Sequence, residues 1–301
     1  MRIGQTGKIT EDLYMLGHPA VPVYLLDGRQ PVIFDAGLAV LGERYLEDLR
    51  QVLGRRPPAF CLLTHSHFDH CGAAGIFKAR FSNLQVVCSQ HAKQVFARPN
   101  ARQLIRQLNL DAVQTAIQLG VQPSRGEFVP FQVDRTVQEG DRIEVSPDLA
   151  VEVLETPGHT RDFLSYYLPS RRVLMASEAM GTLDATGYIV TDCLVDYDLH
   201  YASMQKLARL EVDVLLLAHL YALTGGDARA HMYDSLVQAE KFRHMVEQLW
   251  NESGGDLQGV REHLKAYEYD RYEGIKIPEQ AYLLNLEARI KTVVRKISSS
   301  V

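Results

Sequence analysis

Three histidines and one aspartate fall within six consecutive residues, directly after a short apolar segment. The stretch reads Thr64-His65-Ser66-His67-Phe68-Asp69-His70, and residues 60–64 before it predict a buried strand. In α/β proteins, functional side chains gather at the carboxyl ends of strands, where the sheet holds them rigidly. Imidazole and carboxylate groups bind borderline divalent metals, so the cluster predicts a metal site. On an extended loop, His65 and His67 point to one side and Asp69 and His70 toward a neighbouring position, so one cluster can serve two adjacent ions.

Strands and helices alternate along two halves of the chain, which predicts an α/β fold. Strands are expected at residues 21–26, 31–37, 85–89 and 212–217, and helices at 41–53, 72–81 and 101–119. The last of these helices is expected to be capped by Asn100, to end at Gly120, and to pack through Leu104, Leu108 and Ile117.

Three amphipathic segments follow residue 226, with breaks at Gly254-Gly255 and Pro278. We therefore expect an α/β domain over residues 1–226 and a helical appendage over residues 227–301. The appendage is expected to cap the active site, with a homodimer interface as the alternative. His200, at the start of a predicted helix, is expected to lie at the surface, with a position lining the pocket as the alternative.

Composition and charge narrow the function classes. The 301 residues carry 32 basic and 37 acidic side chains, a net charge of −5, and no basic run longer than a pair. Because phosphate binding needs clustered Lys and Arg, we expect no nucleic-acid partner. Apolar runs are too short for a membrane span or a signal-peptide core, so a cytoplasmic protein without a membrane partner is expected. Four widely spaced cysteines predict buried, reduced thiols.

The string HSHFDH resembles the HxHxDH signature of the metallo-β-lactamase superfamily, and further motifs follow in that family's order. Residues 156–160, TPGHT, resemble its third motif and supply His159. Glu178 follows a predicted strand where the family places a bridging Asp, and His219 follows another. Asp35 in IFDAG matches the structural Asp of the first motif. The resemblance covers roughly residues 10–225 and implies the four-layer αββα sandwich of that family, here with a C-terminal helical cap.

The resemblance also implies a ligand set for two divalent ions, zinc foremost, with iron or manganese as alternatives. The first ion would be bound by His65, His67 and His159, and the second by Asp69, His70 and His219. Glu178 would reach between them, although the family's bridge is usually Asp. Because Glu is one methylene longer, the replacement leaves open whether both ions are bound.

Two neighbouring ions can share a water and lower its pKa toward neutral, which supplies a hydroxide. Asp69 and His70 are the expected catalytic residues, Asp69 by orienting that hydroxide. The chain has no Gly-x-Ser-x-Gly nucleophile elbow, which favours hydrolysis by metal-held hydroxide over an acyl-enzyme route. The layout resembles the quinolone-signal-response thioesterase type, with glyoxalase II-like motifs. It implies a metallo-hydrolase for a small-molecule thioester or other ester, such as an acyl-CoA-like or glutathione-thioester-like substrate.

Two other functions remain open at this point. The same fold includes mononuclear iron dioxygenases, which share the motifs. A regulatory protein with slow residual hydrolysis would also keep these ligands.

Overall fold

The computed structural model describes residues 1–118, 120–121, 127–271, 273 and 277–297. The chain divides into two compact units, and neither is one continuous stretch. The first unit comprises Met1–Glu155, Asp162–Ser177 and Glu211–Ala228, and the second comprises Thr156–Arg161, Glu178–Leu210 and Arg229–Val301. The chain passes from the first unit to the second for the last time between Ala228 and Arg229, two residues after the end of the expected α/β domain. Two shorter segments before it also belong to the second unit.

Two seven-stranded sheets form the frame of the first unit. One sheet has the strand order β2 (Gly7–Lys8), β3 (Leu13–His18), β4 (Val21–Leu26), β5 (Val32–Phe34), β6 (Phe60–Leu62), β7 (Gln85–Ser89), β8 (Arg135–Val137). The other has the order β1 (Arg2–Ile3), β16 (Ala222–Thr224), β15 (Val214–Leu216), β12 (Val173–Met175), β11 (Leu164–Leu168), β10 (Leu149–Glu155), β9 (Arg142–Ser146).

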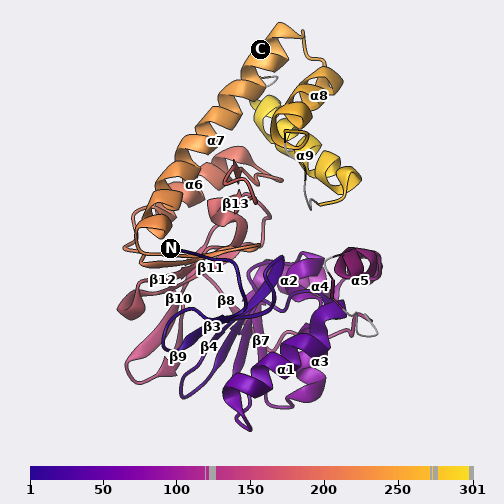
Figure 1. Ribbon diagram of the computed structural model, residues 1–301. Coiled ribbons are helices and arrows are strands. Elements are labelled where there is room, and N and C mark those ends of the chain that lie inside the picture. Colours follow the sequence, from indigo (N-terminus) through magenta and orange to yellow (C-terminus); the bar gives the residue numbers. More distant parts are fainter. Residues whose placement is uncertain (119, 122–126, 272, 274–276, 298–301) are drawn as a thin grey trace. The chain divides into compact units, whose positions relative to one another are not determined.

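The first of these sheets is antiparallel at one side and parallel at the other. Strands β5 to β8 are parallel neighbours, with Ile33 opposite Cys61 and Cys61 opposite Val86. Parallel strands need crossover connections, which α1 (Gly42–Leu53) and α3 (Ala74–Arg80) help to supply over one face of the sheet (Figure 1). The carboxyl ends of β5 and β6 therefore open at the same edge, where the histidine-rich loop begins.

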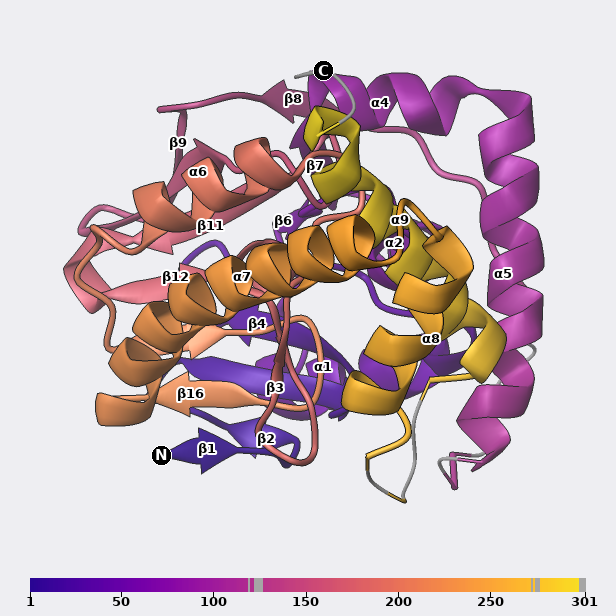
Figure 2. The ribbon, with the colours of Figure 1, turned by 90° about the horizontal axis from the view of Figure 1, so that it is seen from above.

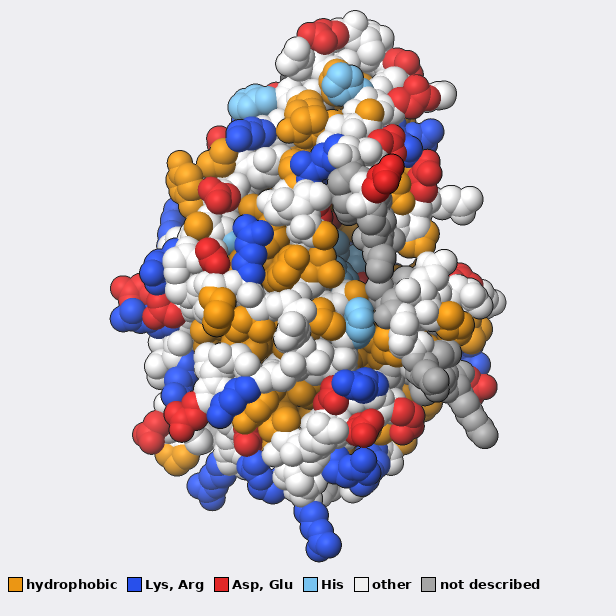
Figure 3. Space-filling model, in the orientation of Figure 1, with side chains coloured by type: hydrophobic (Ala, Val, Ile, Leu, Met, Phe, Trp, Pro, Cys, Tyr) orange, Lys and Arg blue, Asp and Glu red, His pale blue; other side chains and the backbone are white. Residues whose placement is uncertain are grey.

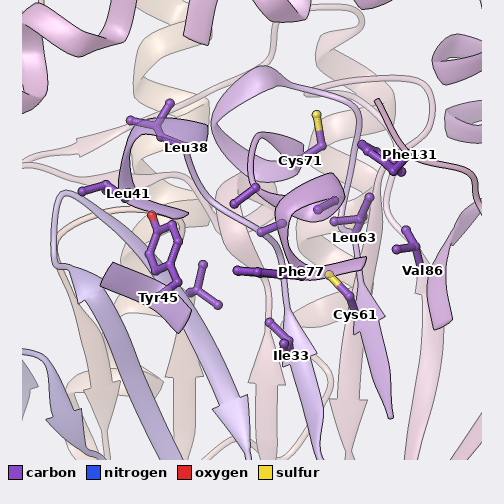
Figure 4. Packing of buried hydrophobic residues seen from close by; sticks show 14 of the residues in the cluster. Ile33, Leu38, Leu41, Tyr45, Cys61, Leu63, Cys71, Phe77, Val86 and Phe131 are labelled. Carbon is purple, nitrogen blue, oxygen red and sulfur yellow. The ribbon is translucent and has the colours of Figure 1, made fainter. Parts of the chain in front are cut away.

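Apolar side chains of both sheets interdigitate in one core, and a second core lies between the first sheet and its helices. In the core between the sheets, the rings of Phe34 and Tyr166 lie 5.9 Å apart. In the helix-side core, Tyr45 of α1 and Phe77 of α3 meet edge to face at 6.1 Å (Figure 4). Helices, sheet and sheet thus form an α/β sandwich, which confirms the expected fold class.

The first unit also contains the helices α4 (Gln90–Ala97) and α5 (Pro99–Gln118). The expected cap at Asn100 is wrong, because α5 begins one residue earlier at a proline, whose fixed φ suits the first turn. The expected end is confirmed: Gly120 has a φ of +74°, its N–H donates to Ile117 O, and Val121 N–H donates to Ala116 O.

The expected packing face of α5 is also wrong. Leu104 and Ile117 are exposed and Leu108 is half-buried, whereas the buried side chains are Ile105, Asn109, Ala112 and Ala116. The reason is Asn109, whose amide is fully buried and satisfied. Its Oδ1 accepts from Ala39 N at 2.8 Å, and its Nδ2 donates to Ile105 O at 3.0 Å and to Phe68 O at 3.2 Å. A polar residue therefore fixes α5 against the segments that carry Ala39 and Phe68.

The second unit is mainly helical. It contains α6 (Tyr197–Leu207), most of α7 (Gly226–Glu252), α8 (Leu257–Glu268), α9 (Glu279–Ile297) and the hairpin of β13 (Thr182–Leu183) and β14 (Ile189–Val190). The three segments after residue 226 are confirmed as helices, and α9 packs beside α8 (Figure 2). Their shared core includes Phe242, Leu264 and Leu286. His200, in the first turns of α6, is 0% exposed because its backbone packs closely against Gly158, which corrects the expectation of a surface position.

A buried ion pair joins two helices of this core. Arg289 of α9 donates twice to Glu268 of α8, at 2.8 Å each, and both side chains are nearly inaccessible. None of the described helices is long and apolar enough to cross a membrane. On the face shown in Figure 3, acidic and basic side chains are interspersed.

Candidate metal centre

The histidine-rich loop follows β6 over residues 63–67 and leads into the short helix α2 (Phe68–Cys71). His67 is still extended, with φ −67° and ψ 149°, and the helix begins at the next residue. His67 therefore lies on extended backbone and His65 lies in the loop after β6, whereas Asp69 and His70 lie in the helical turn. This change of backbone direction brings all four side chains to the edge of the sheet.

Asp35 anchors the loop from the carboxyl end of β5. Its carboxylate is 2% exposed and accepts from Thr64 N at 2.7 Å, from the Thr64 hydroxyl at 3.0 Å and from His70 Nδ1 at 2.8 Å. Because the Thr64 hydroxyl donates to Asp35, its oxygen accepts from His65 Nδ1, 3.0 Å away. One buried carboxylate thus orients two of the predicted ligands.

His219 is held by a different part of the first unit. It follows β15, and its Nδ1 donates to the carbonyl oxygen of Ala20, in the turn between β3 and β4, at 2.7 Å. The next residue, Leu220, has a φ of +64°, and its N–H donates to Pro19 O at 2.7 Å. The β3–β4 turn therefore fixes both the ring of His219 and the bend after it.

Asp69, His70 and His219 converge on one point of the first unit. Asp69 Oδ2 lies 3.8 Å from His70 Nε2 and 3.7 Å from His219 Nε2, and each residue offers a ligand atom within 4.8 Å of the others. His65 and His67 lie beside them, with the His65 ring 4.5 Å from that of His67 and 4.3 Å from that of His70. The structure thus brings together five of the seven predicted ligands within one unit.

Phe163 supports this group from the start of the β11 strand. Its ring stacks on that of His65 at 4.6 Å with an interplanar angle of 20°. Cys71, next to His70, is fully buried, and burial followed by the charge of Asp69 raises its thiol pKa well above the usual value. The thiol is therefore neutral, and all four cysteines are buried and free, as expected.

His159 and Glu178 belong to the second unit. His159 Nδ1 donates to Asp192 O at 2.7 Å. The loop around it is tied to α6, because the Ser203 hydroxyl donates to Pro157 O at 2.8 Å. Glu178 lies in a single 3₁₀ turn, Ser177–Met180, and is 4% exposed.

Four of the five predicted histidine ligands share one hydrogen-bonding pattern. In His65, His70, His159 and His219, Nδ1 donates to a hydroxyl, carboxylate or carbonyl oxygen. A neutral imidazole that donates through Nδ1 keeps its lone pair on Nε2. Metal-binding histidines in proteins are oriented in this way, so the donor set fits divalent metal ions.

Sequence reasoning missed several of these supporting groups. Thr64, Phe163 and Asn109 have no role in the ligand motif, and the carbonyls of Ala20 and Asp192 do not depend on residue type. The sequence contained a signal for Asn109 only. It is a polar residue at helical spacing from Ile105, Ala112 and Ala116, which indicates a buried amide on the packing face of the helix.

Comparisons with known proteins concern the family and the fold of the chain. Residues 16–219 match the sequence profile of the metallo-beta-lactamase superfamily. A hydroxyacylglutathione hydrolase of Rhodopseudomonas palustris is 28% identical over 155 residues, 52% of this chain and 45% of that relative. One from Rhizobium meliloti is 41% identical over 100 residues, 33% of this chain and 36% of the relative. The matched stretch thus spans less than half of either curated relative.

A solved metallo-beta-lactamase family protein of Thermus thermophilus superposes with a TM-score of 0.68 at 19% identity, covering 97% of this chain and 95% of that one. It shares the fold. Since the family profile covers about two thirds of the sequence, the chain belongs to the metallo-β-lactamase superfamily of metallo-hydrolases.

Proposed function

We propose that this chain is a metal-dependent hydrolase that cleaves small-molecule thioesters or related esters. The observation that carries the proposal is the common orientation of the four histidines, each donating through Nδ1 to a fixed oxygen. Such orientation costs conformational freedom and is typical of side chains that bind metal. The names of the hydroxyacylglutathione hydrolase relatives support a thioester as the substrate class.

The proposed ligand assignment follows the order of the family's motifs. By that order, His65, His67 and His159 would hold the first ion, Asp69, His70 and His219 would hold the second, and Glu178 would contribute a carboxylate to both. Chain connectivity supports the inclusion of the last two motifs. His159 lies in the short connection between β10 and β11, and Glu178 stands three residues after the end of β12.

Bound divalent ions would lower the pKa of a water molecule and polarise the substrate carbonyl. The chain's own residues would then position the reactants. Asp69 is only partly buried, and its Oδ2 lies between the Nε2 atoms of His70 and His219, where it can accept a proton from the attacking water. Water adds to the thioester carbonyl carbon and the carbon–sulfur bond breaks, which yields a carboxylic acid and a thiol.

A thiol-release assay tests the proposal. The purified protein is analysed for zinc, iron and manganese. It is then incubated with acyl-glutathione and acyl-CoA thioesters, whose cleavage releases a thiol, and with a lactone and a phosphodiester, whose cleavage is followed by the acid that it releases. We expect thiol release that a chelator abolishes and that added metal restores. His67→Ala should lose most of the bound metal, whereas His91→Ala, a change at an exposed histidine of α4, should behave as the parent does.

Two results would favour a different function for the protein. Bound iron with oxygen consumption and no thiol release would favour the dioxygenase. Full metal occupancy without turnover of any substrate in the panel would favour the regulatory protein.

A further inference from the structure

Two tyrosines lie in the core between the two sheets of the first unit, and each donates a hydrogen bond across that core. Tyr24 belongs to β4 of one sheet and Tyr166 to β11 of the other, and both side chains are 0% exposed. A hydroxyl in a protein interior needs a partner, because leaving it unmet is unfavourable. Both hydroxyls bond to a backbone carbonyl that follows a strand of the opposite sheet.

Tyr166 holds the chain just before His65. Its hydroxyl donates to Leu63 O at 2.7 Å, and Leu63 is the first residue after β6. The N–H of Leu63 still donates to Val87 O of the neighbouring strand, at 2.9 Å. Among the described residues, no second donor bonds to the carbonyl oxygen of Leu63, which is fully buried. The hydroxyl therefore fixes the backbone where the strand ladder ends, two residues before a predicted ligand.

Tyr24 makes the corresponding contact beside His219. Its hydroxyl donates to Leu217 O at 2.7 Å and lies 3.4 Å from Tyr221 O. Leu217 is buried and is the first residue after β15. It stands two residues before His219, and Tyr221 stands two residues after it. In the described part of the chain, Leu217 O accepts from this hydroxyl alone. One hydroxyl thus lies between the carbonyls on both sides of the histidine.

The two contacts are reciprocal, because each sheet supplies the tyrosine that holds a ligand-bearing segment of the other. A hydroxyl that only needed a partner could bond to any carbonyl of the core. Both instead bond to the residue that stands two before a predicted ligand. Metal sites need their ligand atoms held to within about 0.5 Å by the groups behind them. A shift of either carbonyl would move the backbone that carries the histidine ring.

We propose that these two tyrosines are positioning residues of the metal centre. Tyr24 fixes the segment that carries His219. Tyr166 fixes the segment that carries His65. The inference rests on the proposed function, since it assumes that the centre binds metal. The alternative is that the two hydroxyls stabilise the core alone and have no effect on the ligands.

Removing each hydroxyl singly tests the proposal. Tyr24→Phe and Tyr166→Phe keep the ring in the core and delete one hydrogen bond, so both variants should remain folded. Each should bind zinc about 10-fold more weakly than the parent in competition with a chromogenic chelator, the lower end of the effect of groups behind metal-binding histidines. The two variants are measured independently, so either one alone gives a result.

Tyr167→Phe is the matched control. Tyr167 is the next residue of β11, is also buried, and donates through its hydroxyl to Glu211 O at 2.7 Å. Glu211 precedes β15, at the end of that strand opposite to His219. The control should therefore lower the Tm as the other two variants do, but it should keep the parent's zinc affinity.

Spectra of the metal-free protein follow each histidine separately. With ¹⁵N-histidine labelling, the ring signals of His65 and His219 are assigned by their loss from His65→Gln and His219→Gln. Tyr24→Phe should shift or broaden the signal of His219 and leave that of His65 in place. Tyr166→Phe should do the reverse, and Tyr167→Phe should change neither.

The outcomes separate this inference from the proposed function. A parent protein that binds no zinc would refute the proposed function, and the metal-free spectra would still show whether the tyrosines position the histidines. Folded Tyr24→Phe and Tyr166→Phe proteins with the parent's zinc affinity and unmoved histidine signals would refute the positioning role. The two hydroxyls would then serve the stability of the core alone.

Discussion

Replacing Asp35 by Asn tests whether the hydrogen bonds behind the histidines control metal binding. The Asp35 carboxylate accepts from Thr64 through its backbone N–H and hydroxyl, and from His70 Nδ1. An amide of the same shape has only one accepting oxygen. If that oxygen faces Thr64, the new NH₂ group faces His70 Nδ1, and two donors meet at about the same place. His70 then has to move its proton to Nε2, which removes the lone pair that would bind metal.

The size of the effect follows from the one hydrogen bond that must break. A hydrogen bond to a charged group contributes roughly 1.5–3 kcal/mol. Each 1.4 kcal/mol corresponds to about a factor of ten in an equilibrium constant, so Asp35→Asn should weaken metal binding roughly 10- to 100-fold. Changes behind metal-binding histidines in other proteins cost about 10- to 100-fold as well. Removing the buried charge also reduces the attraction for a cation, which acts in the same direction.

Competition with a chromogenic zinc chelator measures this affinity. Asp48→Asn is the control, because Asp48 also accepts from a backbone N–H, that of Gly17 at 2.7 Å, and pairs with Arg44 rather than with a histidine. The control should keep the parent's zinc affinity even if its Tm falls. A folded Asp35→Asn protein with the parent's zinc affinity would refute the reasoning, because the tautomer of His70 would then not govern binding.

Three further changes test other parts of the structure. Glu178→Gln should reduce the bound metal toward one ion per chain, as measured by elemental analysis, because it removes a charge that offsets the cations; unchanged occupancy would argue against a bridge. Asn109→Leu removes the hydrogen bonds that the amide makes with Ala39 N and Phe68 O, so chemical unfolding should show a loss of about 1–3 kcal/mol. Glu268→Gln leaves Arg289 as an uncompensated buried charge and should cost about 3–5 kcal/mol at neutral pH.

The effect of Glu268→Gln on the free energy of unfolding also depends on pH. Burial alone would raise the pKa of Glu268, but the charge and hydrogen bonds of Arg289 outweigh it, and the pKa lies below its ordinary value of 4.5. The stability from this ionised carboxylate is therefore fully present above about pH 4.5 and is lost as the pH falls through the lowered pKa. The difference in unfolding free energy between parent and Glu268→Gln should shrink over that acid range. A difference that does not change with pH would mean that the pair is not ionised in the folded protein.

The ligand cluster and its place at a strand end could be predicted because they are local in sequence. His65, His67, Asp69 and His70 are contiguous with the apolar residues of β6, so strand, loop and ligands were visible together. The packing of α5 could not be predicted in the same way. Leu104 and Ile117 look like core residues by type, yet three hydrogen bonds from the Asn109 amide determine which face is buried. Hydrophobic periodicity does not register a polar side chain whose partners lie on other elements.

The least predictable part of the centre is the backbone that orients it. His219 is aimed by the Ala20 carbonyl, almost two hundred residues away in sequence, and any residue at position 20 would offer the same oxygen. The bend after His219 places Leu220 at a positive φ, which costs a branched residue of order 1–3 kcal/mol. A glycine there would have marked the turn, whereas leucine gives no sign of it. The strain persists because Leu220 N–H donates to Pro19 O and Tyr221 N–H to His219 O. Backbone contacts from a distant hairpin therefore hold the histidine in place, and only the folded structure reveals them.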